Sequence, residues 1–476
     1  MKKVILINSN NEHVPYPVPP IGLMMIYSSI KNKYNTKIID GMFISPLKIL
    51  KEIKNFNPDY IGISIRNIDN IQLIDSICYY DHIKNNLIDP IKEFSLSPII
   101  LGGSGFSIFA EKLMKNLNVD FGVVGEGERV FPELLKYLDN KMDPSSIAGV
   151  IVKGKRDFIK NTQFLSVRTL PFSDFDKHIN YIPYKERSVY SIQTKRGCYH
   201  RCNYCTYPYL EGRSYRLRSV KDIVDEIEEA KKRLGYLIFE FVDSTFNDPP
   251  GHAERICEEI IKRKINVGLR TMGINPENSS EKLFDLMLQA GFKQIDCTPD
   301  SASPAMIKNL RKNFTLEQLI KTAKIIKSKN IPTMWFFIFG GPGESEETID
   351  ESFTFVDKYV NDFDMVHVTK GLRIYPNTEL YNIALKERVI NKDEDLIYPK
   401  FYISKNLNLE KLNDIIKEKT LTRLNCITAE ESTPPKEMIE AAIKLRAKLS
   451  LEEPMFRTLL KLRQQIFNKR DLSVIK

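Results

Sequence analysis

TKRGCYHRCNYC, residues 194–205, is the stretch of sequence that decides the fold and the chemistry of this chain. It brings together three of the seven cysteines, Cys198, Cys202 and Cys205, in a CxxxCxxC spacing. The other four cysteines are scattered. An odd total in a long chain without a recognisable export signal argues against a disulfide framework. The clustered cysteines therefore point to metal binding.

The spacing of these cysteines favours an iron–sulfur cluster over zinc. Thiolates suit both metals, but a structural zinc ion normally takes four ligands and no fourth cysteine lies nearby. His200 lies between two cysteines, where its ring and the thiolates could hardly converge. Three thiolates instead leave one iron of a [4Fe–4S] cluster open for a substrate or cofactor. A zinc clasp or a chance trio is the alternative.

Length and composition describe a globular protein of more than one domain. The 476 residues are 42% hydrophobic and 28% charged, as expected for about two to four domains. No apolar run reaches the ~20 residues of a membrane helix, and the opening MKKVILINSN is too short in apolar residues for a signal peptide. We therefore expect a cytoplasmic protein without a membrane partner. The net charge of +9 is spread along the chain and favours a solvated basic surface over nucleic-acid binding.

Residues 1–145 predict a doubly wound (Rossmann-like) parallel sheet in an α/β fold. Short apolar runs end at glycine or a small polar residue, and helical segments separate them. The predicted strands are 4–7, 36–39, 60–65, 98–101 and 121–124. Ligands of such sheets bind at the carboxyl ends of the strands, where this chain carries Ser64, Gly102, Gly103 and Gly125.

Residues 188–395 repeat the alternation and predict a partial (β/α)6 barrel. The predicted strands are 189–193, 237–242, 267–271, 294–298, 333–339 and 365–372. Barrel chemistry lies at the carboxyl ends of the strands, and the cysteines follow the first of these. Polar residues 146–187, with Pro171 and Pro183, are predicted to form a linker. Residues 396–476 are predicted to be mostly helical and to act as a lid or in substrate recognition.

The cysteine loop at the end of a first barrel strand resembles that of the radical S-adenosylmethionine (SAM) superfamily. The resemblance implies that Cys198, Cys202 and Cys205 hold a [4Fe–4S] cluster whose open iron chelates the amino and carboxylate groups of SAM. It also implies that Tyr204 lies near the adenine.

Three further segments resemble that superfamily and supply candidate SAM-binding residues. Asp243 ends the second strand as a candidate for the SAM amino group, and Asp300 and Ser301 follow the fourth as candidates for the ribose or carboxylate. Gly341 and Glu344 belong to a fifth-strand element, residues 337–344, whose backbone contacts adenine in the family. Each position has a plain alternative, a strand-end turn with a capping acid.

An ordered set of loops in the first domain resembles the cobalamin-binding domain of cobalamin-dependent radical SAM enzymes. The candidate cobalamin-binding residues are Pro20, Gly22, Ser64, Arg66, Gly102, Gly103, Gly125 and Glu126. The resemblance continues through residues 212–219 and 373–380 and covers roughly residues 1–400. Taken one at a time, these loops are also compatible with ordinary tight turns after strands.

The sequence departs from that family at the cobalt ligand. Many cobalamin domains carry Asp-x-His-x-x-Gly, but neither His13 nor His82 has the flanking Asp and Gly. We therefore expect no lower imidazole ligand and hypothesise that Arg66 lies beneath the corrin, where a cation disfavours a sixth ligand to cobalt. The alternative is that Arg66 pairs with Asp69 or with a corrin amide.

The resemblance implies a methyltransferase that uses a [4Fe–4S] cluster, SAM and cobalamin to methylate a small-molecule or peptide substrate. An external electron donor of the flavodoxin or ferredoxin type is the implied partner. Radical cleavage of SAM and polar methyl donation both stay open, and no catalytic acid or base is assigned. The alternatives are a cyclase, ring-contraction or oxidative enzyme of the same family, and a cobalamin sensor. A tRNA methylthiotransferase is disfavoured because it needs a second cysteine trio, whereas the first domain has only Cys78.

Overall fold

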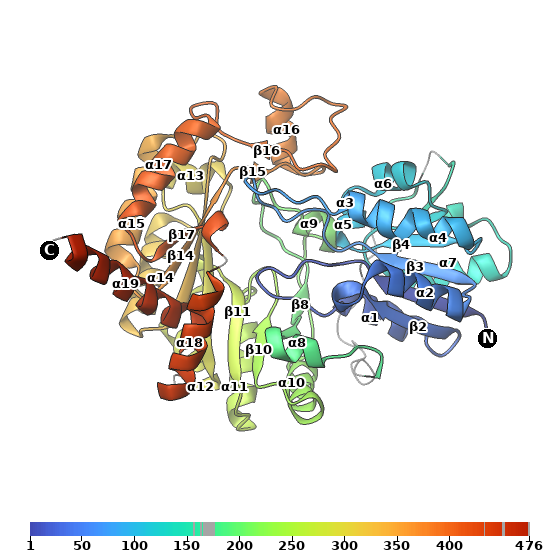
Figure 1. Ribbon diagram of the computed structural model, residues 1–476, viewed down its shortest axis with the longest axis horizontal. Helices are drawn as coiled ribbons and strands as arrows, with labels where there is room; N and C mark the ends of the chain where they lie inside the picture. The colour runs from blue at the N-terminus through green and yellow to red at the C-terminus, as the bar shows by residue number, and fades with distance from the viewer. Residues whose placement is uncertain (156–157, 162–163, 165–176, 433, 450–452, 475–476) are drawn as a thin grey trace.

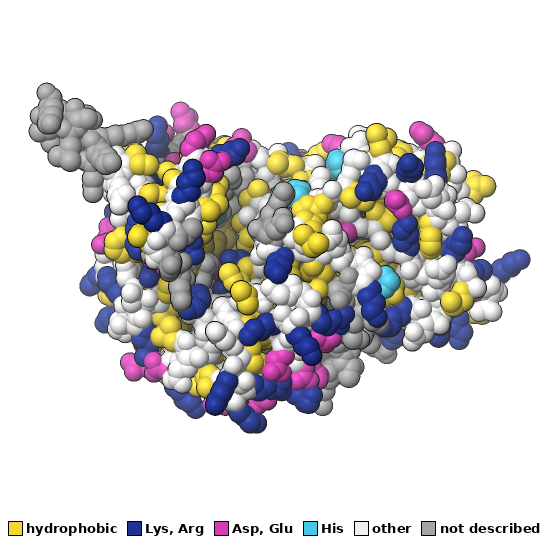
Figure 2. Space-filling view, turned by 60° about the horizontal axis from the view of Figure 1, so that its bottom comes forward, with side chains coloured by type: hydrophobic (Ala, Val, Ile, Leu, Met, Phe, Trp, Pro, Cys, Tyr) yellow, Lys and Arg dark blue, Asp and Glu magenta, His cyan; other side chains and the backbone are white. Residues whose placement is uncertain are grey.

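The computed structural model describes residues 1–155, 158–161, 164, 177–432, 434–449 and 453–474. Two α/β domains lie side by side in Figure 1: an N-terminal one coloured blue to cyan and a barrel-like one coloured green to orange. Among the described residues no helix is long and apolar enough to span a bilayer. On the face shown in Figure 2, Lys and Arg side chains are scattered among acidic and apolar ones, in line with a basic charge that is spread out.

The N-terminal sheet has the strand order β2-β1-β3-β4-β5-β6. Its strands are β1 (Lys3–Asn8), β2 (Asn35–Asp40), β3 (Tyr60–Ser64), β4 (Ile99–Gly102), β5 (Phe121–Val123) and β6 (Val150–Val152). The first five are parallel and β6 is antiparallel to β5. The strand order reverses between β1 and β3, so their carboxyl ends border the crevice where doubly wound sheets bind ligands.

Helices cover both faces of this sheet, as the apolar strands predict. On β1, Val4 and Leu6 pack into one core and Ile5 and Ile7 into the other. The first core includes residues of α1 (Ile21–Ile30) and α7 (Gly127–Asp139). The second includes residues of α2 (Pro46–Phe56), α3 (Tyr80–Ile83), α4 (Asp89–Phe94), α5 (Ser104–Ile108) and α6 (Ala110–Leu117). The predicted doubly wound sheet is confirmed.

The second domain is built on a seven-stranded parallel sheet of order β17-β14-β13-β12-β11-β10-β7. Its strands are β7 (Tyr190–Ile192), β10 (Ile238–Phe241), β11 (Gly268–Ile274), β12 (Phe292–Asp300), β13 (Thr333–Phe339), β14 (Met365–Lys370) and β17 (Cys426–Thr428). The helices that follow or connect them are α10 (Val220–Leu234), α11 (His252–Lys262), α12 (Glu281–Ala290), α13 (Pro304–Asn309), α14 (Leu316–Ser328), α15 (Glu346–Tyr359) and α17 (Leu409–Leu421). The six predicted barrel strands are therefore confirmed.

Alternation along the strands sets the two faces of this sheet. On β13 the residues Trp335, Phe337 and Phe339 are buried against the outer helices, whereas the residues between them are only half-buried. A side chain points to opposite faces at successive strand positions, so this pattern separates a packed outer face from a more accessible inner one. Helix boundaries follow local chemistry: α10 begins after Ser219, whose hydroxyl accepts from the Asp222 amide, and ends at Gly235 with φ +68°.

Two segments differ from the sequence predictions. The predicted linker, residues 146–187, contributes β6 to the first sheet and α8 (Ile182–Arg187), and residues 165–176 with Pro171 lie outside the described residues. The predicted helical region after residue 395 contributes β16 (Phe401–Tyr402), which pairs with β15 (Leu372–Arg373), and the edge strand β17. Runs of two or three residues carry too little periodicity to be read from sequence.

The last two helices close the amino end of the barrel. They are α18 (Lys436–Leu449) and α19 (Met455–Val474). Phe456 and Leu460 of α19 pack with Met365 at the start of β14, and Arg457 forms a 2.7 Å ion pair with the buried Asp364. Because the cysteines follow the carboxyl end of β7, this part of α19 lies at the end of the barrel opposite to them, which does not support the predicted lid.

Candidate functional site

The cysteine loop begins where β7 ends and is tightly built. The short strands β8 (Lys195–Arg196) and β9 (Arg216–Leu217) pair antiparallel around it. Gly197 has φ +88°, and a Cβ atom there would lie 2.1 Å from the Ser214 carbonyl oxygen, so the turn into Cys198 requires glycine. The loop leads into α9 (Tyr207–Glu211).

The three cysteines form one enclosed group of thiols. Cys198 is buried, Cys202 and Cys205 are half-buried, and none is in a disulfide. Burial raises the pKa of the Cys198 and Cys202 thiols and raises that of Cys205 to about 12, and the charges of neighbouring thiols add to the rise. Such thiols become thiolates when positive metal ions are present to hold the charge.

This donor set fits a cluster better than a single ion. Among the described residues, no three Cys, His, Asp or Glu side chains converge as the ligands of one metal ion. A single zinc ion draws its thiolates to about 2.3 Å. A cubane cluster is held at three different irons, so its cysteines stand farther apart. The fit is therefore to the predicted [4Fe–4S] cluster and not to a zinc clasp.

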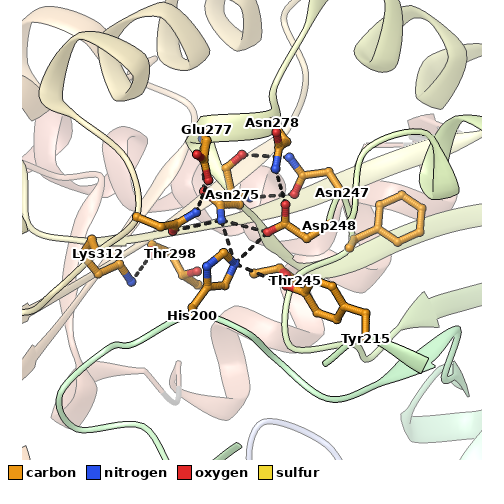
Figure 3. Close-up of polar contacts among 12 residues, drawn as sticks. His200, Tyr215, Thr245, Asn247, Asp248, Asn275, Glu277, Asn278, Thr298 and Lys312 are labelled. Atoms are coloured by element: carbon orange, nitrogen blue, oxygen red, sulfur yellow. Dashed lines mark hydrogen bonds and ion pairs between the residues drawn. The ribbon is translucent and has the colours of Figure 1, made fainter. Parts of the chain in front are cut away.

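His200 anchors the loop to the barrel and is occupied by that role. Its Nε2 atom lies 2.8 Å from Oδ2 of Asp248, a carboxylate with no exposed surface that also accepts hydrogen bonds from Asn275 and Asn278 (Figure 3). The Tyr215 hydroxyl lies 3.3 Å from the same ring nitrogen. This network ties the middle of the loop to the segments that follow β10 and β11.

Asp243 holds the start of the loop, and its predicted role toward the amino group of SAM stays a prediction. Its carboxylate accepts from the amide and hydroxyl of Thr194, at 2.8 and 2.5 Å, and from the Lys195 amide. It also forms a 3.3 Å ion pair with the Lys195 ammonium, and both side chains are almost wholly buried. A carboxylate with four internal partners is a structural brace of the loop.

Tyr204 and Asp300 meet beside the cysteines, together with a residue that the sequence did not reveal. The Tyr204 hydroxyl donates to Oδ2 of Asp300, and the Lys312 ammonium lies 2.7 Å from the same oxygen. Burial alone would lower the pKa of Lys312, but the charge of Asp300 outweighs it and holds the pKa above its ordinary value. Lys312 is a single lysine in a loop, and no pattern in the sequence distinguishes it from surface lysines.

Three of the predicted SAM-binding residues are engaged elsewhere. Ser301 is buried and its hydroxyl lies 3.1 Å from that of Ser352, away from the loop. The Glu344 carboxylate accepts from the Gly340 amide and the Thr348 hydroxyl, and burial raises its pKa to about 7. A Cβ atom on Gly341 would lie 3.1 Å from the side chains of Met306 on α13 and of Leu310 directly after α13. Gly341 and Glu344 build the turn after β13, and Ser301 follows β12 and contacts α15. Their binding of SAM stays a prediction.

The carboxyl edge of the first sheet is open where the cobalamin site was predicted. A Cβ atom added to Gly22 or Gly125 would have no neighbouring atom within 4 Å, and one added to Gly102 would have its nearest neighbour at 3.8 Å. Gly103 has φ +99° and approaches the Ile65 carbonyl so closely that any Cβ would clash. The structure brings these glycines together with Ser64, at the end of β3, and Pro20, before α1, into an edge that can take a large ligand.

Glu126 departs from that prediction because it joins the two domains. Its carboxylate receives both guanidinium nitrogens of Arg216, at 2.6 and 3.0 Å, and Arg196 lies 3.4 Å away. Arg196 pairs in addition with Glu128 at 2.7 Å. Since Arg196 comes two residues before Cys198, these ion pairs fix the cysteine loop against the edge of the first sheet.

Arg66 stands at this edge without a partner among the described residues. Its side chain is exposed, yet the surrounding protein displaces enough water to lower the pKa of the guanidinium. It lies within electrostatic reach of Tyr207, which is itself coupled to Cys205. The alternative pairing with Asp69 is wrong: Asp69 forms a buried 2.9 Å ion pair with Arg373 of the barrel domain.

Comparison with known families decides what the two domains are. Residues 192–356 match the model of the radical SAM superfamily, and residues 8–135 match that of the B12 binding domain. The chain therefore has a radical SAM domain and, before it, a B12-binding domain. The radical SAM match begins at the end of β7 and includes the cysteine loop, and the B12-binding match includes the open glycine edge.

Proteins similar to this chain include named methyltransferases. The chain is 26% identical over 384 residues to an uncharacterised methyltransferase of Pyrococcus horikoshii, covering 78% of this chain and 80% of that one. It is 23% identical to a tryptophan 2-C-methyltransferase of Streptomyces laurentii, covering 78% and 73%. In fold, this chain matches a structure of the radical SAM methyltransferase TsrM from Kitasatospora setae solved with cobalamin and a [4Fe–4S] cluster, with TM-score 0.81, 18% identity and all of both chains covered.

Proposed function

We propose that this protein is a cobalamin-dependent radical SAM methyltransferase that methylates a small molecule. The observation that carries the proposal is the juxtaposition of a three-cysteine loop with an open, glycine-lined B12-binding edge, joined by the ion pairs of Arg196 and Arg216 with Glu126. The names of the similar methyltransferases support it, and the tryptophan enzyme supports a small-molecule substrate. When bound, SAM is the methyl donor and a corrinoid is a cobalt carrier that accepts and hands on the methyl group.

The residues of this chain divide the work of binding. We propose that Cys198, Cys202 and Cys205 hold the cluster, with the ammonium of Lys312 beside them. The B12-binding domain, residues 1–145 with β6 added, would hold the corrinoid at Pro20, Gly22, Ser64, Arg66, Gly102, Gly103 and Gly125. The radical SAM domain, residues 188–395, would bind SAM near Tyr204, Asp300 and the backbone at Gly341. An electron donor of the flavodoxin or ferredoxin type and a cytoplasmic location stay predictions.

Turnover of SAM tests this function. Anaerobically reconstituted protein with SAM, cobalamin and a chemical reductant is expected to form S-adenosylhomocysteine and a methylated corrinoid, measured by mass spectrometry and visible absorption. Formation of 5′-deoxyadenosine in addition would assign the radical mode of methyl transfer, and S-adenosylhomocysteine alone the polar mode. Binding of both cofactors without release of either product would contradict the proposal and favour a sensor.

Arg66→Ala is expected to change the environment of cobalt. If Arg66 faces the bound corrinoid, its guanidinium would disfavour a further ligand to cobalt, because a cation has no lone pair to donate. We expect a shifted visible spectrum of the bound corrinoid and methyl transfer slower by about tenfold or more. Arg129→Ala, which removes a guanidinium that pairs with Glu133 on α7, serves as the control. An unchanged spectrum and rate in Arg66→Ala would remove this role.

A further inference from the structure

The inner face of the barrel sheet is accessible in its middle. On β10, Phe239 and Phe241 pack on the outer helices, so Glu240 between them faces inward. Arg270 of β11 also faces inward. Met272, two residues later on the same strand and on the same face, has a side chain that is 48% exposed. On β13 every second residue is likewise only half-buried. The centre of this partial barrel is therefore not packed shut by its own side chains.

The B12-binding domain supplies one wall of this interior. The loop between β1 and α1 reaches across the domain boundary, and the hydroxyl of Tyr16 donates to Oε2 of Glu240 at 2.5 Å. The Arg270 guanidinium lies 2.7 Å from the other oxygen of Glu240 and 4.6 Å from the centre of the Tyr16 ring. Tyr16 is also within electrostatic reach of Arg66. The wall thus runs from the B12-binding edge into the barrel.

The charges of this wall leave one carboxylate without a cation. Glu240 and Arg270 neutralise each other, while Asp296, inward-facing on the adjacent strand β12, receives among the described residues only the Gln294 amide, at 3.0 Å. The side chain lies within electrostatic reach of both members of that pair. Burial raises the pKa of Asp296 to about 7, although the Gln294 amide and the Arg270 charge act against this rise.

The inner face that continues from β12 onto the neighbouring strands β13 and β14 is apolar and polarisable. Phe336 faces inward on β13, and the His367 ring of β14 lies 5.3 Å from the Phe336 ring. Met334 packs against Phe456 and Leu460 of α19, whereas Met272 of β11 contributes an exposed thioether. Burial lowers the pKa of His367, so this ring contributes no positive charge near neutral pH. Thioethers and aromatic faces pack well against a flat apolar group and also attract cations.

From this arrangement we infer the chemical class of the substrate, on the basis of the proposed function: a compound with an aromatic or flat apolar frame that carries a protonated amine. Asp296 receives the amine, and the rings of Phe336 and His367 with the exposed Met272 side chain receive the frame. Tyr16 closes the site from the B12-binding domain, so the carbon to be methylated is held between the two domains. Asp296 is on this account a specificity-determining residue.

Matched ligands with one ring and three different end groups test this inference. Phenethylamine, 2-phenylethanol and 3-phenylpropionate are each titrated into the full-length protein, and binding is measured by saturation-transfer NMR. We expect phenethylamine to bind at least about tenfold more tightly than the other two. That preference should disappear in Asp296→Asn and persist in Asp296→Glu. Asp285→Asn, which removes an outer carboxylate that pairs with Lys329, should behave as the unaltered protein does.

Each outcome bears on the assignment. Equal binding of the three compounds, a preference that survives in Asp296→Asn, or no binding of any of them would overturn it. Circular dichroism of the variants shows whether they are folded. The titration needs no turnover, so the two proposals can fail separately. Selective amine binding in a protein that releases no S-adenosylhomocysteine would refute the proposed function and leave the substrate site in place. Release of S-adenosylhomocysteine without selective amine binding would refute the substrate site and leave the proposed function in place.

Discussion

Replacement of Cys198, Cys202 or Cys205 by alanine is expected to abolish the iron–sulfur cluster and every activity that needs it. Each thiol is the sole protein ligand of one iron in a three-cysteine site, so two thiolates cannot retain the cubane. In anaerobically purified protein, iron and sulfide should fall from about four per chain to nearly none. Chemical analysis and visible absorption measure both.

Cys78→Ala is the matched control for these variants. Cys78 is a half-buried thiol of the B12-binding domain that lies outside the loop, and its Sγ atom lies 3.6 Å from the Ile397 carbonyl oxygen. It should keep its full iron content. Four irons in any variant of the trio, or the same loss in Cys78→Ala, would refute the cluster assignment and with it the proposed chemistry.

Arg373→Met is expected to be the most destabilising single change at the domain boundary, by about 3–5 kcal/mol. The side chains of Arg373 and Asp69 are 2% and 0% exposed, and their ion pair joins the barrel to the B12-binding domain. Without the guanidinium, Asp69 would keep a buried charge with only the Ile71 amide to offset it, and two carbonyl oxygens would lose their donor. Thermal or denaturant unfolding of the purified protein measures the loss.

A double variant separates the buried charge from the loss of packing. Asp69→Asn combined with Arg373→Met removes both charges and should recover part of the stability. Arg311→Met, which breaks a largely exposed pair with Glu379, should cost less than about 1 kcal/mol. Equal effects of Arg373→Met and Arg311→Met would mean that the buried pair does not hold the domains together.

The strands and the cysteine loop could be predicted because local chemistry dominates there. Apolar runs such as 4–7 and 333–339 leave few alternatives to a buried strand, and the spacing of Cys198, Cys202 and Cys205 is constrained by the metal. The glycines after β4 and β5 were also predictable, since strands that end in glycine at a ligand edge leave room for a cofactor.

Partners of the charged residues could not be predicted, because they depend on side chains that are distant in the sequence. Asp243, Glu126 and Glu344 stand at strand ends, where an acid can either bind a ligand or brace a turn, and all three have internal partners that the sequence did not reveal. Lys312 carried no signal at all. For Tyr16, the Pro-rich stretch VPYPVPP around an aromatic was a signal of a projecting loop, but its target Glu240 is 224 residues away.

The ties between the domains also limit how molecules enter and leave. Asp69 with Arg373, Glu126 with Arg216, and Tyr16 with Glu240 join the two halves at three separate places. These contacts oppose a hinge-like separation of the two domains when a ligand binds. We therefore expect substrates to enter without domain opening, so that molecular size limits access before any chemical group is recognised.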